Sequence, residues 1–151
     1  MDMVSIGRFW SAFAVMVLPI LIFGCSEGGG SGTLEPMADE PMVLESVMCL
    51  DVDEARPVGI TNSFLESDKE IYIWIYWINV EGKSNVKVAW FEPDKELPFR
   101  EDSQLIDSST GFSITWFFIE RPAEGFPDGE WSVDIYLDGL FERSHLFVVE
   151  S

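Results

Sequence analysis

Few residues of this 151-residue sequence belong to the types that carry out covalent or metal chemistry. The chain holds two cysteines, Cys25 and Cys49, and one histidine, His145. A single histidine excludes multi-histidine zinc or iron sites, and two cysteines cannot form a disulfide framework. His145 needs a nucleophile and an orienting acid beside it, and no Gly-x-Ser-x-Gly motif marks such a serine. We therefore predict that the chain is not an enzyme; an enzyme with an unrecognised site is the remaining alternative.

Two further residue patterns resemble a catalytic and a metal-binding motif, but each lacks the other residues that its motif requires. Ser84 and Lys87 match the Ser-x-x-Lys spacing of penicillin-binding enzymes, yet the accompanying motifs are missing and the segment opens an expected strand rather than a helix. Asp51, Asp53 and Glu54 form a dense acidic group whose oxygens suit Ca²⁺, but they lack EF-hand spacing. We predict no metal and no cofactor.

The charge balance restricts the class of partner. Nine basic residues against 27 acidic ones give a formal net charge of −18. Binding to nucleic acid and docking on anionic lipid both require clustered lysine and arginine, so the sequence predicts neither. An apolar share of 47 % is too high for a disordered chain, so most of the sequence must fold.

The first 24 residues have the composition of a secretory signal peptide. Arg8 is followed by an apolar stretch over residues 9–23, interrupted only by Ser11. About 15 residues are fewer than the ~20 that a membrane-spanning helix prefers. The stretch ends in Ile22-Phe23-Gly24-Cys25, which resembles the lipobox of bacterial lipoproteins. An uncleaved anchor, or a signal cut at another position, is the alternative.

The lipobox resemblance implies that Cys25 is acylated and becomes the N-terminus, with Gly24 as the small residue before the cut. It places the protein in the bacterial cell envelope, held to a membrane by its lipid. Ser26 stands where an aspartate would resemble an inner-membrane retention signal, which favours the outer membrane in a bacterium with two membranes. Residues 25–42 are Gly-rich and acidic, and predict a flexible tether of roughly 20–25 Å.

From residue 43 to the end, apolar residues alternate with period two, which predicts strands. Asp138-Gly139 predicts a type I′ hairpin turn. Residues 81–83 are expected to form a turn, and residues 94–111 and 121–129 the longest loops. We expect seven short strands, over residues 45–52, 60–64, 70–80, 86–91, 112–119, 131–137 and 141–149. This number of strands in one domain predicts an antiparallel β-sandwich over residues 43–151.

Two segments carry a resemblance to a known fold family. Residues 129–139, with the closing strand to Val149, are similar to the last hairpin of bacterial immunoglobulin-like modules, and residues 90–94 resemble a strand and turn of such modules. Residues 49–53, together with 56–61 and Phe64, resemble uncharacterised bacterial lipoproteins carrying one such domain. The resemblance implies an immunoglobulin-like fold and transfers no activity.

The most apolar expected strand, residues 70–80, offers a candidate binding face. Tyr72, Trp74 and Tyr76 share one side of it and could stack on sugar rings or on a partner protein. The alternative is that both faces of the sheet are covered. The expected strand over residues 112–119 also alternates, which places Phe112, Ile114, Trp116 and Phe118 on one face; the sequence assigns no binding role to them.

The sequence therefore predicts a membrane-anchored envelope lipoprotein whose β-sandwich binds or scaffolds without catalysis. Its partner is expected to be an envelope protein or a glycan. A carbohydrate-binding module is the main alternative, and it requires Tyr72, Trp74 and Tyr76 to be exposed and coplanar. Cys49 is expected to be a small buried residue on the first strand, with a reactive thiol or an intermolecular disulfide as alternatives.

Overall fold

The structure, a computed structural model, describes residues 40–151. The predicted signal peptide, Cys25 and nearly all of the tether lie outside the described residues. Residues 40–151 contain strands and no helix, and hence no helix that is long and apolar enough to cross a membrane. The strands are β1 (Met42–Asp53), β2 (Arg56–Ile60), β3 (Ser63–Leu65), β4 (Glu70–Phe91), β5 (Arg100–Glu120), β6 (Gly129–Leu137) and β7 (Leu140–Glu150).

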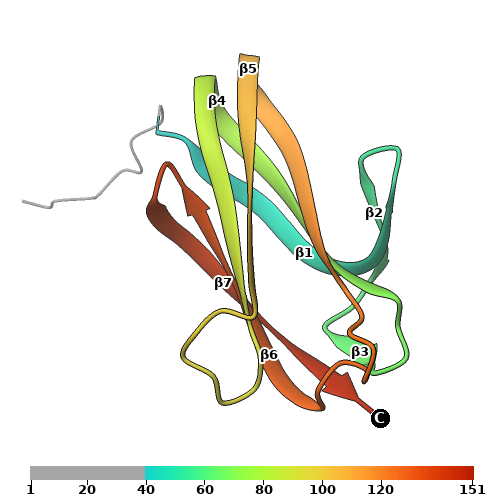
Figure 1. Ribbon diagram of the computed structural model, residues 1–151. Helices are drawn as coiled ribbons and strands as arrows, with labels where there is room; N and C mark the ends of the chain where they lie inside the picture. The colour runs from blue at the N-terminus through green and yellow to red at the C-terminus, as the bar shows by residue number, and fades with distance from the viewer. Residues whose placement is uncertain (1–39) are drawn as a thin grey trace, which may run out of the picture. The chain divides into compact units, whose positions relative to one another are not determined.

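Strands β4 and β5 are shared by the two layers of the sandwich. Residues 70–78 of β4 pair with β1, residues 86–91 pair with β6, and β5 pairs with both parts. Figure 1 shows the two strands bending together as one ribbon. The first layer therefore contains β2, β1, residues 70–78 of β4 and residues 112–120 of β5. The second layer contains β3, β7, β6 and the remaining halves of β4 and β5.

The ribbon bends where the chain adopts left-handed backbone conformations. Asn79 and Gly82 have φ angles of 57° and 77°, and Gly111 of the paired strand has 79°. The register of β4 against β5 shifts at this point, as it does at β-bulges, which bend a strand without ending its pairing. The turn expected at residues 81–83 is therefore wrong, and β4 is continuous.

The loop expected at residues 94–111 is also wrong over most of its length. Residues 100–108 pair with residues 82–90 of β4, so only residues 92–99 connect the two strands. The expected strand at residues 60–64 is two strands. β2 ends at Ile60 and pairs with β1, whereas β3 begins at Ser63 and pairs with β7 in parallel.

The hairpin between β6 and β7 is confirmed. Asp138 and Gly139 have φ angles of 50° and 84°, and positive values at both central residues define the type I′ turn. Leu137 pairs with Leu140 across it.

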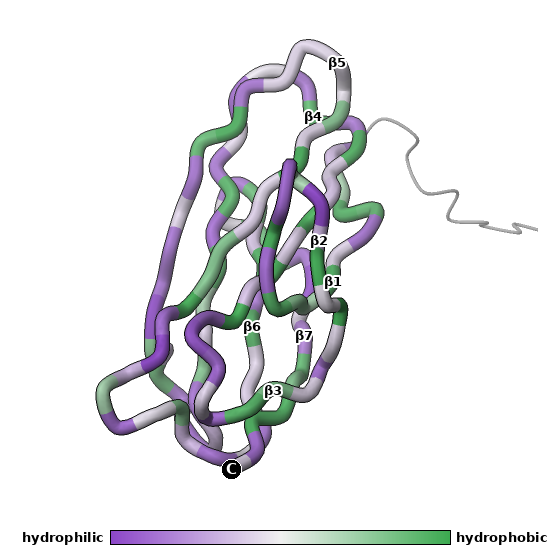
Figure 2. The backbone as a smooth tube through the Cα atoms, turned by 90° about the vertical axis from the view of Figure 1, so that its right-hand side faces the viewer, coloured by the Kyte–Doolittle hydropathy of each residue, from purple (hydrophilic) through white to green (hydrophobic). Residues whose placement is uncertain are grey.

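The core lies between the layers and is rich in aromatic rings. Trp131 and Phe147 stack with ring centroids 5.9 Å apart, and Trp77 donates its indole N–H to Thr115 Oγ1 at 2.9 Å. Alternate apolar side chains of residues 71–77 and 131–137 point into this core, and Figure 2 shows hydrophobic and hydrophilic residues alternating along the strands. The fully buried aromatic side chains are Trp77, Trp90, Trp131, Phe64, Phe126 and Phe147.

Candidate binding surface

The three aromatic residues singled out by the sequence lie on the outer face of the first layer, but not equally open to solvent. Trp74 is 8 % exposed, and Tyr72 and Tyr76 are half-buried. Trp74 stacks on Tyr76 with ring centroids 6.3 Å apart, and its indole N–H donates to the carbonyl oxygen of Ala55 at 2.8 Å. Because Ala55 lies in the turn between β1 and β2, this turn covers the middle of the predicted face.

Tyr72 is held from both sides. Its hydroxyl donates to Glu70 Oε2 at 2.5 Å, and its ring lies against Phe118 with centroids 5.2 Å apart. Burial and the Glu70 carboxylate both raise the pKa of Tyr72 well above its ordinary value. The phenol therefore stays protonated and acts as a fixed hydrogen-bond donor.

The open part of this face is formed by β5. Each of its side chains there lies opposite a residue of β4: Trp116 opposite Trp74, Ile114 opposite Tyr76, and Phe112 opposite Ile78. We call Phe112, Ile114 and Trp116 the exposed row; their exposed fractions are 54 %, 37 % and 42 %. The sequence placed these residues on one face but gave no signal that this face is the open one.

The exposed row lies on a strand with an unused edge. β5 pairs with β4 and with no other strand among residues 40–151. Every second residue of such a strand turns its N–H and C=O outward, where another chain can pair with them. Residues 112–119 contain no charged residue, no proline and no glycine, which are the features that usually block such pairing. We call this stretch the open edge.

Carboxylates border the open edge. Glu120 continues the outer face beyond Phe118, at one end of the open edge, and lies directly opposite Glu70. Glu45 lies farther away on the same layer, on β1, and β4 separates it from β5. Glu81 lines a surface hollow together with Phe112 at the bend of the ribbon. Both ion pairs within residues 40–151 involve the first half of β5, so none neutralises these four carboxylates.

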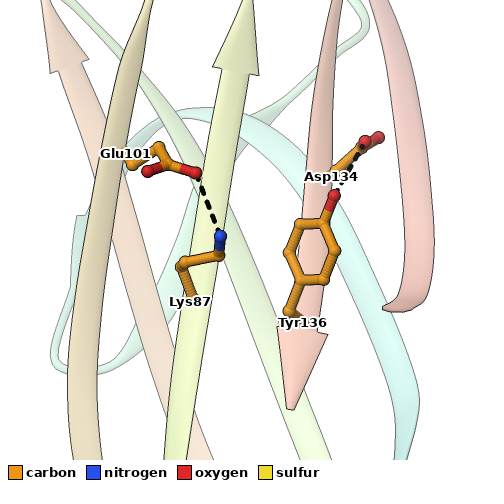
Figure 3. Close-up of polar contacts among 4 residues, drawn as sticks. All are labelled: Lys87, Glu101, Asp134 and Tyr136. Carbon is orange, nitrogen blue, oxygen red and sulfur yellow. Dashed lines mark hydrogen bonds and ion pairs between the residues drawn. The ribbon is translucent and has the colours of Figure 1, made fainter. Parts of the chain in front are cut away.

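On the outer face of the second layer, polar groups of β4, β5 and β6 satisfy one another (Figure 3), whereas β7 exposes the apolar side chains of Leu146 and Val148. Lys87 Nζ lies 3.0 Å from Glu101 Oε1 and 4.7 Å from the centre of the Tyr136 ring. The Tyr136 hydroxyl donates to Asp134 at 3.4 Å. Burial, followed by the Asp134 charge, raises the pKa of Tyr136. This face offers few unsatisfied groups to a partner.

The structure also brings His145 beside a serine. Ser46 Oγ lies 2.7 Å from His145 Nε2, and Arg143 donates to the same oxygen at 3.2 Å. Burial and the Arg143 charge lower the pKa of His145, so the imidazole is neutral at pH 7. Ser46 is buried, and no carboxylate within residues 40–151 hydrogen-bonds to His145. The three side chains join β1 to β7, which is a structural role.

The remaining sequence candidates lie apart from the exposed row. Ser84 and Lys87 lie within strand β4, where Ser84 is buried. Cys49 is buried on β1, as expected, and burial raises the pKa of its thiol. Asp51 accepts a hydrogen bond from its neighbour's backbone, and no group of three metal-ligating side chains gathers within residues 40–151.

The connection between β4 and β5, which includes the start of the long loop expected at residues 94–111, borders a surface hollow of about 690 Å³. Residues 92–96 form one side of the hollow and strand β6 the other. Its lining includes five carboxylates, from Glu92, Asp94, Glu96, Glu130 and Asp134. These carboxylates show no ion pair within the described part of the chain, so the hollow adds to the acidic character of the protein without forming a defined site.

Two layers of this topology, sharing a bent ribbon around an aromatic core, make the protein an immunoglobulin-like β-sandwich, as the sequence predicted. A solved structure of an immunoglobulin-like protein from Pseudomonas aeruginosa is similar to it, with a TM-score of 0.51 and 10 % sequence identity; the match covers 75 % of this chain and 99 % of that chain. At this identity the likeness shows the fold alone. No protein-family model matches the chain, and no curated protein matches it.

Proposed function

We propose that this protein is a non-catalytic binding module of the bacterial envelope, anchored through an acylated Cys25, that presents the outer face of its first layer to a partner protein. The observation that carries the proposal is the exposed row beside the open edge of β5. Neighbouring apolar side chains that stay in contact with water are characteristic of surfaces that bind other proteins.

The anchor is supported by the sequence alone. Ile22-Phe23-Gly24-Cys25 resembles a lipobox, and the Gly-rich stretch that follows would let the sandwich turn freely near the membrane. Acyl chains contribute about 0.8 kcal/mol per buried CH₂, so several chains anchor stably. Cys25→Ser should abolish incorporation of labelled palmitate and release the protein from the membrane fraction. Unchanged partitioning would contradict the anchor.

A protein partner is favoured over a glycan by the shape of the surface. Stacking on sugar rings requires neighbouring open rings, whereas Trp74 is covered by the turn at Ala55 and an isoleucine, Ile114, separates the two exposed rings of β5. A mixed row of aliphatic and aromatic side chains along a strand instead matches the side chains of another polypeptide.

A photo-crosslinking amino acid placed in the intact bacterium tests the binding surface. At position 116 it should produce one discrete protein adduct. The matched control is position 105, because Leu105 is 65 % exposed on the same strand but in its first half. Equal adducts at both positions, or none at position 116, would contradict the proposed surface.

A further inference from the structure

We infer that the open edge, residues 112–119 of β5, is a strand-addition site for an extended segment of a partner protein that carries apolar side chains at alternate positions and basic side chains at its two ends. This inference rests on the proposed function and specifies the partner's conformation and chemistry. It combines three features of the structure: the unpaired backbone, the exposed row and the unpaired carboxylates around them.

The backbone of the open edge is a regular template. The register of β5 against β4 is unbroken from the pair Glu70 and Glu120 to the pair Ile78 and Phe112. An unbroken register keeps the outward N–H and C=O groups at even spacing, so an added strand can form a continuous ladder of hydrogen bonds. The bulges that disrupt β4 and β5 lie beyond Phe112, at the bend.

The exposed row requires apolar partner side chains at alternate positions. Ile114 and Trp116 are two residues apart and project from the same face. Side chains of an added strand that project from that face would lie about 4.5–5.5 Å from them, between Cβ atoms. Alternation follows because the other side chains of the added strand point to the opposite side of the sheet.

The surrounding charge requires a basic partner rather than a second copy of this chain. Glu120 follows Ile119 at one end of the open edge and Glu81 lies with Phe112 at the other, and neither forms an ion pair among residues 40–151. Lysine or arginine in the added segment would neutralise them. Two copies would each bring a formal net charge of −18 to the interface, and like charges oppose such pairing.

A peptide probe tests the inference on the full chain in detergent micelles. The probe, the valine–lysine peptide, is a fluorescent decapeptide with capped ends in which two lysines at each end flank a core of alternating valine and serine. One comparison peptide replaces each lysine with glutamate, and another keeps every side chain but carries N-methyl groups on alternate backbone amides. The protein variants are Ile114→Lys in the open edge and Leu105→Lys as the matched control. The urea unfolding midpoint of each variant verifies that it is folded.

We expect the valine–lysine peptide to bind the wild-type protein, with Kd raised at least tenfold by Ile114→Lys and changed less than twofold by Leu105→Lys. The glutamate peptide and the N-methylated peptide should each bind at least tenfold more weakly, because the first reverses the charge and the second blocks the ladder.

Other results would overturn the inference in distinguishable ways. Equal binding of the N-methylated peptide would exclude strand addition, and equal binding of the glutamate peptide would exclude a basic partner. Self-association that Ile114→Lys abolishes would assign the edge to a second copy, and Trp116-dependent binding of a polysaccharide would assign the face to a glycan. Absence of peptide binding would overturn the strand-addition inference but not the proposed function, because the crosslinking experiment at position 116 tests that function independently.

Discussion

The two halves of strand β5 share one neighbour, β4, and both lie at an edge of the sandwich, yet their chemistry differs. The first half, residues 100–108, carries Arg100, Glu101, Asp102 and Asp107. Charged side chains of this kind discourage pairing with another chain. The second half, residues 112–119, carries none. One strand therefore has a charged edge in the second layer and an uncharged edge in the first, and this difference lies in the side chains rather than in the fold.

The outer side chains of β4 and β5 repeat this difference between the layers. On the second layer, Lys87 neutralises Glu101 and lies over Tyr136. On the first layer, the exposed row has no such contacts, and Glu45 and Glu120 remain without ion pairs within residues 40–151. A surface that satisfies its own polar groups gains little from a partner, whereas an apolar row beside unpaired charges gains both burial and neutralisation.

The two halves of β5 are alike on their inner side, and substitutions there should cause the greatest loss of stability. Phe117 and Ile106 point into the core from the second and first half, with exposed fractions of 6 % and 5 %. Removing a buried side chain costs its transfer free energy and leaves a cavity. Phe117→Ala should therefore lower the free energy of unfolding by about 3–5 kcal/mol and Ile106→Ala by about 2–5 kcal/mol. Urea unfolding measures both, and a loss below about 1 kcal/mol in either variant would show that this half does not pack as described.

An intermediate effect concerns the turn that partly covers the first layer. Trp74→Phe keeps a ring but removes the indole N–H that donates to Ala55. We expect a loss of about 1 kcal/mol in the free energy of unfolding, the usual net value of one hydrogen bond. Limited proteolysis at residues 54–56 should also become faster, because the turn is released. Unchanged proteolysis would mean that other contacts hold the turn in place.

On the outer side of β5, the two halves should differ in how the stability of a variant depends on salt. Glu101→Gln breaks the ion pair with Lys87 and should cost about 0.2–1 kcal/mol, with the loss shrinking in high salt because the pair is partly exposed. Urea midpoints at low and high salt measure this. Ile114→Gln is the matched change in the open edge and should show no dependence on salt; a salt-dependent loss there would weaken the contrast between the two halves.

The smallest expected change in stability comes from His145 on β7, and it depends on pH. Burial and Arg143 lower the pKa of His145 in the folded chain, whereas the unfolded chain retains a value of about 6.5. Between these two pKa values the unfolded state binds more protons, so the histidine's contribution to stability is complete above pH 6.5 and is lost as the pH falls through this range. His145→Gln should remove this contribution.

The thermal midpoint of each protein, compared between pH 7.5 and pH 5, isolates the histidine from the general effect of the acidic residues, which both proteins share. The wild-type protein should lose more stability than the variant on acidification. Equal losses would show that His145 is not held neutral beside Arg143.

Most of the sandwich could be predicted because strands buried on one face alternate visibly. The alternation along residues 131–137 by itself predicts that Val133 and Ile135 share a buried face, and Asp138-Gly139 predicts its hairpin from local sequence. The first half of β5 was missed because Ile106 and Ser108 are the buried residues among its polar side chains, so residues 100–108 resemble a loop. Its strand conformation depends on pairing with β4, which is a long-range contact.

The candidate surface also depends on long-range contacts, so the sequence predicts it only in part. Tyr72, Trp74 and Tyr76 share the expected face, but the turn that covers Trp74 comes from residues 19 positions earlier in the chain. The edge position of β5 is a property of topology, and no local pattern in residues 112–119 specifies it. The absence of charge in that stretch was visible in the sequence and becomes informative only once the strand is known to lie at an edge.

Amide hydrogen exchange of β5 decides whether the open edge adds a strand, because it reports on the backbone groups of both halves in one experiment. The full chain is measured alone and with the valine–lysine peptide. We expect alternate amides within residues 112–119 to exchange rapidly in the free protein and to become protected when the peptide is added, while residues 100–108 do not change. Unchanged exchange in residues 112–119, or equal protection of both halves, would contradict this expectation.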